Sequence, residues 1–290
     1  MKNKNCIVVV NYFASEILHN VVDISKNYNI DIIIVDNSCD EKELFNLETN
    51  FKDIKIVFNK NNVGFGSGCY IGTEEAKKHA NYDNFLFVNP DISEVNLAKI
   101  SEALEEFGQD QKAAYFQPLI LDNRENNSIL GIIEASDIKV VLLYTFIKKI
   151  FTSLEQYVLY ARELNKNKTN IYIPSGAFFI VKADVLNRIG GFPRDTFLYF
   201  EEWLFAYRVK KLGMYGYIDA SLKVHHEIGY STGLQYGAGS AKMLRYRKQA
   251  FEIAVEKIIT SSIASFGLKL IVKLDSYVRL AILNLKKVKK

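Results

Sequence analysis

Short apolar runs, each ending at polar residues, recur along the first third of this chain. The runs are rich in β-branched residues and cover 6–12, 30–38, 54–59 and 84–92. Apolar residues at helical spacing lie between the first two runs (16–26), and a glycine-rich turn before the last run leads into a helix (62–80). Strands that alternate with helices predict an α/β fold built on an open, mostly parallel sheet.

Polar side chains stand at the carboxyl ends of three of these predicted strands. They are Asn11, then Asp36, Asn37 and Ser38, then Asn89 and Asp91. Ligands bind at this edge of open parallel sheets. The three polar clusters therefore predict one binding site.

The size and composition are those of a folded globular protein. The 290 residues are 49% hydrophobic and 24% charged, which allows one large domain or one domain with an appendage. The three cysteines (Cys6, Cys39 and Cys69) form no CxxC pair, so we expect a reducing cytoplasm and neither disulfides nor a zinc site. No apolar run is long enough to predict a signal peptide or a membrane-spanning helix.

Positive charge is concentrated at the C-terminus. Residues 242–290 contain 12 Lys and Arg but only 3 Asp and Glu, a local charge of +9 against +4 for the whole chain. Apolar residues at mostly helical spacing alternate with these cations from Leu268 to Leu285. Such a helix either packs on the body of the protein or lies on an anionic membrane, and we expect peripheral binding to the membrane. We expect no nucleic-acid partner, because no recognised binding module precedes this segment.

The pattern of the middle of the chain predicts the domain organisation. Residues 123–170 are apolar and aromatic with interspersed lysines, which predicts a helical insertion that acts as a lid or a binding flap. Residues 171–192 predict a strand, a small-residue turn, a second strand and a short helix that ends at two glycines. We expect a main domain over 1–240 and a basic helical tail over 241–290.

Three motifs at the predicted site have two interpretations each. The glycines of NVGFGSG (62–68) let a backbone approach a phosphate, but the same pattern also makes a plain tight turn. Asp36 would accept hydrogen bonds from a base or ribose, or would cap the next helix. Asn89 and Asp91 offer hard oxygen ligands that suit Mg²⁺ or Mn²⁺ shared with a diphosphate, or they close the strand as an Asx-turn.

Two adjacent glutamates interrupt an aromatic and aliphatic run further along the chain. Glu201 and Glu202 either begin an amphipathic helix, whose dipole favours acids there, or include a catalytic base. Trp203, directly behind them, either offers an aromatic plane to a sugar ring or packs in the core. His226 is a metal or phosphate ligand or a surface residue, and the hydroxyl of Ser231 follows it.

The order of these motifs resembles a known family. The chain runs strand-NY, strand-VDNS, N-x-GFGSG, strand-NPD, SGAFF, GGF, YFEEW and H-x-x-x-x-S. This order resembles the family 2 glycosyltransferases, of the GT-A fold, and in particular the bacterial polysaccharide-assembly branch that includes rhamnosyltransferase-like enzymes. The resemblance covers roughly residues 5–235. It implies inverting transfer of a sugar from a UDP- or dTDP-linked donor to a hydroxyl of a lipid-diphosphate-linked saccharide, in capsule or O-antigen synthesis at the inner face of the cell membrane.

The resemblance also implies a role for each motif. It places these residues at the donor nucleotide and diphosphate: Asn11, Tyr12, Asp36, Asn37, Asn62, Gly64 and Asn89. It places Asn89, Asp91 and His226 around a Mn²⁺ or Mg²⁺ ion, and Ser175, Gly176, Ala177 and Trp203 beside the sugar and acceptor. Glu201 and Glu202 match the acidic pair of the family, whose second member normally supplies the catalytic base. Glu202 is therefore the expected base.

Three positions depart from the family pattern. Tyr70 stands where the family often has asparagine, Leu204 where it usually has aspartate, and Asn89 where the metal motif usually begins with an acid. These departures leave open a catalytically inactive scaffold that binds a sugar nucleotide within a polysaccharide-assembly complex. A nucleotidyltransferase would show a glycine-rich, basic signature directly after the first strand, and "VVNYFASE" has none. A homodimer is also left open.

Overall fold

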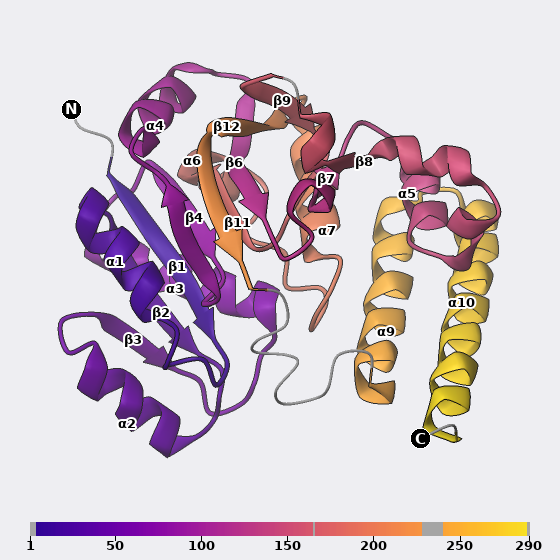
Figure 1. Cartoon of the computed structure of the whole chain (residues 1–290), viewed down its shortest axis with the longest axis horizontal. Coiled ribbons are helices and arrows are strands. Elements are labelled where there is room, and N and C mark those ends of the chain that lie inside the picture. Colours follow the sequence, from indigo (N-terminus) through magenta and orange to yellow (C-terminus); the bar gives the residue numbers. More distant parts are fainter. Residues whose placement is uncertain (1–3, 165, 228–239, 289–290) are drawn as a thin grey trace.

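The first half of the main sheet is parallel, as the sequence predicts. The computed structural model describes residues 4–164, 166–227 and 240–288 (Figure 1). Four parallel strands lie in the order β3-β2-β1-β4: β1 (Asn5–Asn11), β2 (Asp31–Asp36), β3 (Lys55–Phe58) and β4 (Asn84–Val88). Three helices connect them: α1 (His19–Tyr28), α2 (Glu41–Asn50) and α3 (Phe65–His79). The predicted α/β sheet is confirmed.

The second half of the sheet is mixed. β11 (Phe178–Lys182) is antiparallel to both β4 and β6 (Ala113–Leu121), and β12 (Tyr215–His226) is parallel to β6. β5 (Ile92–Asn96) and β9 (Lys168–Ile171) pair antiparallel with β12. Because Phe178 pairs with Val88, the residues that follow β4 lie beside those that precede β11. This pairing brings two of the predicted motifs, 89–91 and 175–177, to one edge.

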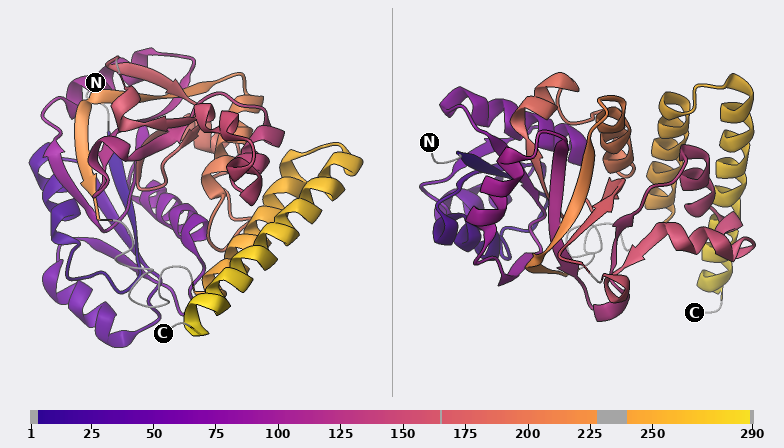
Figure 2. Two further views of the ribbon diagram at one scale, coloured as in Figure 1. Left: turned by 45° about the vertical axis from the view of Figure 1, so that its right-hand side comes forward. Right: turned by 90° about the horizontal axis from the view of Figure 1, so that it is seen from above.

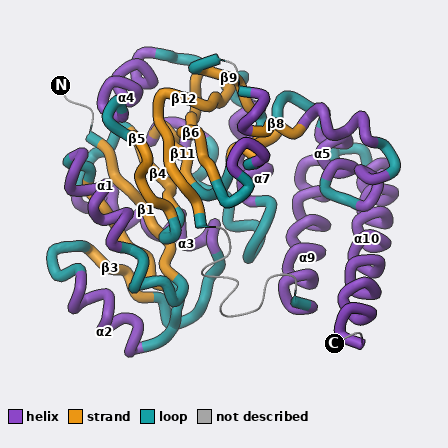
Figure 3. Tube along the Cα trace, viewed as in Figure 1, coloured by secondary structure: helices purple, strands orange, loops and turns teal. Residues whose placement is uncertain are grey.

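Side chains that alternate along the strands build two apolar layers. In β1, Ile7 and Val9 pack in the layer with α1 and α4 (Ile100–Gln109), while Cys6 and Val8 pack in the layer with α3, α6 (Ala183–Arg188) and α7 (Glu201–Lys211). All four side chains are buried. Figure 3 shows helices on both sides of the strands, which is the arrangement that continuously apolar parallel strands require.

The insertion at 123–170 contains helices, as expected, and also short strands that the sequence did not predict. A second, three-stranded sheet has the order β10-β7-β8, formed by β7 (Ile129–Ile132), β8 (Val158–Tyr160) and β10 (Ile173–Pro174). Besides α5 (Asp137–Leu143), the segment has four short 3-10 helices, at 125–127, 146–149, 152–157 and 161–163. The strands are short, and β7 pairs both with β8 and with β10 beyond the segment, so local periodicity gave no sign of them.

The basic C-terminal segment forms two helices, α9 (Ala241–Ile258) and α10 (Ser262–Val288). They lie side by side at one end of the molecule, beyond α7 as seen from β1–β3 (Figures 1 and 2). α9 buries Phe251, Ala254 and Val255 in one core cluster with residues of α5 and α7. Within the described parts of the chain, no helix combines the length and apolarity needed to cross a bilayer.

A buried carboxylate attaches α10 to its neighbours. Asp275 is 1% exposed, and its Oδ1 accepts a hydrogen bond from the backbone N–H of Phe146 at 2.8 Å. Its Oδ2 lies 3.2 Å from Nη1 of Arg247 on α9 and 2.7 Å from Nε of Arg279 on α10. One carboxylate therefore ties together α9, α10 and the insertion.

Candidate active site

One cavity of about 500 Å³ opens at the carboxyl ends of the parallel strands. Residues that follow β1, β2 and β4 form one part of its wall, and the start of α7 and the turn before β11 form another. Of the residues predicted from the sequence, it is lined by Tyr12, Asn37, Asn62, Gly64, Asn89, Ser175, Gly176, Ala177, Glu201, Glu202, Trp203 and His226. The fold thus brings most of the predicted site residues together.

The glycine-rich turn is held by asparagine side chains. Nδ2 of Asn37 donates to the carbonyl of Gly64 at 3.0 Å, and the N–H of Gly64 donates to Oδ1 of Asn62 at 2.9 Å. Gly64 has φ +83°, and a Cβ there would lie 2.1 Å from the carbonyl oxygen of Phe197. Only glycine fits here, because its backbone both adopts the left-handed conformation and packs against the segment that leads into α7.

Asn11 and Asp36 lie beneath the cavity wall and do not line it. Both are fully buried, and Nδ2 of Asn11 donates to Oδ1 of Asp36 at 2.9 Å. The other oxygen of Asp36 accepts from the hydroxyl of Ser38 at 2.8 Å, and Asn11 also donates to Oε1 of Glu43 at 3.1 Å. Burial raises the pKa of Asp36. In this structure the pair positions the strand ends, and their neighbours Tyr12 and Asn37 reach the cavity.

Asp91 and His226 meet near the end of β4. Nε2 of His226 lies 3.2 Å from Oδ1 of Asp91, and the two side chains are 17% and 6% exposed. Among the described residues, that buried oxygen has no partner with hydrogen-bond geometry. An unsatisfied carboxylate oxygen beside an imidazole, with Asn89 on the cavity wall, is a donor set that fits Mn²⁺ or Mg²⁺.

A metal ion at this place would need ligands from the substrate. Within the part of the chain that the structure describes, no three His, Cys, Asp or Glu side chains lie close enough together to hold an ion. Diphosphate oxygens and water commonly complete the coordination of Mg²⁺, because this ion is usually bound by one or two carboxylates. The residues present therefore fit a metal that is shared with a diphosphate. Ser231, expected nearby, lies outside the described residues.

The two glutamates begin α7 but occupy different surroundings. Glu201 is 2% exposed, and within the described chain its Oε2 has no hydrogen-bond partner. Glu202 is half-buried and reaches Gly176: a Cβ at that glycine would lie 1.9 Å from Oε1 of Glu202. The backbone enters the helix through Tyr199 and Phe200, both in the left-handed region at φ 78° and 66°. Two consecutive non-glycine residues in this region are strained, and such strain clusters at functional sites.

The two carboxyl groups titrate as a pair. Burial raises the pKa of Glu202, and burial together with the charge of Glu202 raises the pKa of Glu201 well above its ordinary value. Cys69 lies near both acids, and burial keeps its thiol neutral by raising its pKa. Glu202 therefore ionises first, and Glu201 remains a neutral carboxylic acid.

Trp203 belongs to the core rather than to an exposed sugar platform. It contributes to the cavity wall but is only 1% exposed, and its Nε1 donates to Oδ1 of Asp137 at 3.0 Å. Its ring packs edge-on against Phe200 and Phe251. Leu204, which replaces the family aspartate, is also buried in this cluster and does not face the cavity.

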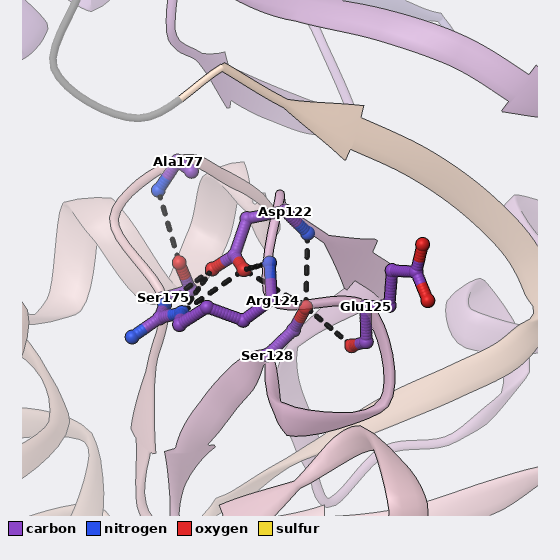
Figure 4. Close-up of polar contacts among 6 residues, drawn as sticks. All are labelled: Asp122, Arg124, Glu125, Ser128, Ser175 and Ala177. Atoms are coloured by element: carbon purple, nitrogen blue, oxygen red, sulfur yellow. Dashed lines mark hydrogen bonds and ion pairs between the residues drawn. The ribbon is translucent and has the colours of Figure 1, made fainter.

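The turn before β11 is supported by two side-chain contacts. Oε1 of the buried Gln117 accepts from the N–H of Ser175 at 2.8 Å, and its Nε2 donates to the carbonyl of Leu130 in β7 at 2.7 Å. The hydroxyl of Ser175 accepts from the N–H of Ala177 at 3.4 Å (Figure 4). Gln117 thus joins the main sheet, the second sheet and the turn that carries Gly176.

The loop between β6 and β7 is organised by Asp122, which is also drawn in Figure 4. Its carboxylate accepts from Nε of Arg124 at 2.9 and 3.0 Å and from the hydroxyl of Ser128 at 3.1 Å. These bonds lower the pKa of Asp122. The loop is fixed in place directly before Ile129, which lines the cavity.

Several cavity residues were not predicted from the sequence. They include Tyr144 from the insertion, Tyr199 before α7, and Arg247 from α9. Tyr199 stands close to the predicted acids, and its aromatic character was the available signal. Tyr144 and Arg247 come from distant segments that tertiary packing brings to the site.

Neither a protein-family model nor a curated protein matches this sequence. Solved structures match its fold. GalNAc-T7 with UDP, GalNAc and Mn²⁺ superimposes with a TM-score of 0.58 at 15% identity, over 87% of this chain and 47% of that chain. The mannosyltransferase PcManGT from Pyrobaculum calidifontis, in complex with GDP-Man and Mn²⁺, gives 0.54 at 13% identity, over 96% and 70%. S. aureus TarS gives 0.50 at 11% identity, over 92% and 69%.

These comparisons confirm the predicted fold class. The chain has the GT-A fold, which it shares with these solved structures. It spans about half the length of the GalNAc-T7 chain, at 47%.

The raised pKa of Glu201 makes a prediction about stability. The folded protein holds this proton more tightly than the unfolded chain, so the free energy of unfolding falls as pH rises above the ordinary range of a glutamate. Glu201→Gln replaces this carboxyl group with an amide that does not titrate. The melting temperature of this variant relative to wild type should therefore increase between about pH 5 and about pH 8. Glu102→Gln, at an exposed position on α4, is the control. A difference for Glu201→Gln that does not change with pH would contradict the assignment.

Proposed function

We propose that this protein transfers a sugar from a nucleotide-diphosphate donor to an acceptor hydroxyl, with inversion at the anomeric carbon. The observation that carries this proposal is the placement of Glu202. A carboxylate with a raised pKa lines the same cavity as the strand-end asparagines and His226, and His226 lies 3.2 Å from Asp91. The GT-A fold, shared with transferases whose structures contain UDP or GDP-Man together with Mn²⁺, supports the same class of donor.

In the proposed reaction Glu202 is the general base. It takes the proton of the acceptor hydroxyl while that oxygen attacks the anomeric carbon and the bond to the diphosphate breaks. Gly176 leaves room for the Glu202 carboxylate, and the packed start of α7 fixes its position. When bound, a divalent ion held by Asp91, His226 and Asn89 would offset the charge of the leaving diphosphate.

Inversion is favoured because Glu202 is the one acid of the pair suited to react. A double displacement needs a nucleophile in addition to an acid or base. Glu201 is only 2% exposed, and burial raises its pKa well above the ordinary value, which disfavours it as that nucleophile. A single base and a direct displacement match the available groups.

Replacing the two acids separately tests the base. Glu202→Gln should keep donor binding but lower kcat by at least about a hundredfold, since it removes the general base. Glu201→Gln should be mild, because it exchanges one neutral group for another. In wild type the rate should rise with pH through a midpoint above the ordinary range of a glutamate, and Glu202→Gln should lose this dependence.

A displaced base gives a further readout of the same prediction. Gly176→Ala keeps the Glu202 carboxylate but forces it to move, so its kcat should fall between those of wild type and Glu202→Gln. Gly267→Ala, whose Cβ would meet nothing within 4 Å, is the matched control. A larger loss for Glu201→Gln than for Glu202→Gln would assign the base to Glu201. No loss in either variant would support the inactive-scaffold alternative.

Replacing Asp91 tests the metal assignment. Asp91→Ala should weaken the Mn²⁺-dependent binding of UDP or GDP, because it removes the one carboxylate of the proposed ligand set. Turnover should be lost while the melting temperature without ligand stays near that of wild type. Calorimetric titration of nucleotide with Mn²⁺, and again with EDTA, measures the effect. Full activity of Asp91→Ala in EDTA would refute a metal at this position.

We also propose that the acceptor is a lipid-linked saccharide and that α10 lies on an anionic membrane, at the inner face of the cell membrane. The face of α10 opposite its buried side is apolar and exposed, at 44% to 88%: Ile263, Phe266, Leu270, Leu274, Tyr277, Val278, Ile282 and Leu285. Lys269 and Lys273 lie beside this face. Burial of this apolar face in the membrane, together with the attraction of the basic residues to anionic lipid, favours binding to an anionic membrane.

Substitutions on this face test membrane binding better than truncation does, because a chain stopped near Arg245 would lose the buried residues of α9. The triple variant Phe266→Ser, Leu270→Ser and Leu274→Ser should sediment less with anionic liposomes than wild type. Phe45→Ser, at a 67% exposed position on α2, is the control. Equal sedimentation of the triple variant, or indifference to lipid charge and salt, would show that the face has another role.

A further inference from the structure

Arg247 places a half-buried positive charge in the wall of the cavity. Its side chain is 18% exposed. Nη2 donates to the carbonyl of Tyr144 at 2.5 Å, Nη1 lies 3.2 Å from Oδ2 of Asp275, and the guanidinium carbon is 5.7 Å from the ring of Phe200. Arginine has five N–H donors in a planar fork, and these contacts use only part of that capacity.

The charge of Arg247 is only partly balanced. Asp275 is the sole carboxylate within ion-pair distance of Arg247 among the described residues, and it is shared with Arg279, whose Nε lies 2.7 Å from the same oxygen. Two guanidinium groups thus share one carboxylate. Arg279 is 41% exposed and is screened by water, so the excess charge is the one at the cavity. Burial, and then repulsion from Arg279, lower the pKa of Arg247.

The immediate neighbours of Arg247 in the cavity wall are largely aromatic. It contributes to the wall with Tyr144, Tyr199 and Phe200. The strand-end asparagines and Gly64 line the same cavity. Aromatic neighbours lower the local polarity, which strengthens attraction to an anion.

We propose that Arg247 binds an anionic group of the acceptor, a phosphate or a carboxylate, next to the position where the sugar is transferred. This inference rests on the proposed glycosyl transfer and names the acceptor class: an acidic or phosphorylated saccharide. A guanidinium matches the two oxygens of either group in a bidentate contact. The negative charge of this group balances the part of the Arg247 charge that Asp275 does not balance.

Small charged sugars provide probes that need no knowledge of the natural acceptor. The protein is first saturated with UDP or GDP and Mn²⁺, and then titrated with glucose 1-phosphate, glucuronate or neutral methyl glucoside. Binding is followed by calorimetry, with and without the nucleotide. Wild type should bind one of the two anionic sugars and not the neutral one. Comparison of glucose 1-phosphate with glucuronate shows whether the site binds a phosphate or a carboxylate.

Variants assign the binding to Arg247. Arg247→Met should lose at least about tenfold in affinity for the anionic sugar, the value of a charge-assisted hydrogen bond. Arg247→Lys should keep part of the affinity, and it serves as the test if Arg247→Met fails to fold. Arg279→Gln leaves Asp275 to Arg247 alone, so by the same charge argument its affinity for the anionic sugar should lie between those of wild type and Arg247→Met.

The outcomes separate this inference from the proposed function. Equal binding of the anionic and neutral sugars by wild type, or unchanged binding by Arg247→Met, would overturn the acceptor assignment. Weaker nucleotide binding by Arg247→Met would assign the arginine to the donor site, and this result would also overturn the acceptor assignment. If wild type binds no nucleotide, the proposed function fails, and the titration without nucleotide still decides whether Arg247 holds an anion.

Discussion

The contact between Phe200 and Phe251 joins the C-terminal helices to the start of α7. The two rings stack with centroids 4.3 Å apart, and both side chains are buried. Phe200 holds a left-handed backbone conformation that a bulky residue adopts only under constraint, and this packing provides the constraint. Because Glu201 and Glu202 follow directly, the direction of both carboxyl groups depends on helices that are distant in sequence.

Burial divides the two glutamates into different roles. Neighbours on a helix point about 100° apart, so Glu202 reaches Gly176 while Glu201, which also contributes to the cavity wall, is 2% exposed. Two charges so close together in a poorly hydrated place do not both form, and the more buried one stays neutral. The acid pair therefore functions as one ionisable base with a neutral neighbour. Arg247 adds a positive charge to the wall of the same cavity.

Local pattern was enough to predict the sheet and much of the candidate site. Strand ends, the glycine turn and the acid pair were visible because parallel strands place successive carboxyl ends at one edge. What local pattern did not show depends on distant packing: β7 pairs with β10 beyond its own segment, and the buried Trp203 packs in a core made partly by α9. Arg247 was counted only as part of a basic tail, since nothing local shows that α9 returns to the cavity.

The most direct test of the account is a thermal-shift panel of nucleotide sugars with Mn²⁺, repeated in EDTA. A ligand that binds only the native state raises the melting temperature, by an amount that grows with its concentration relative to Kd. The account predicts that at least one UDP-, GDP- or dTDP-linked sugar stabilises the protein with Mn²⁺ and does so much less in EDTA. No stabilisation by any nucleotide or nucleotide sugar at saturating concentrations would contradict it.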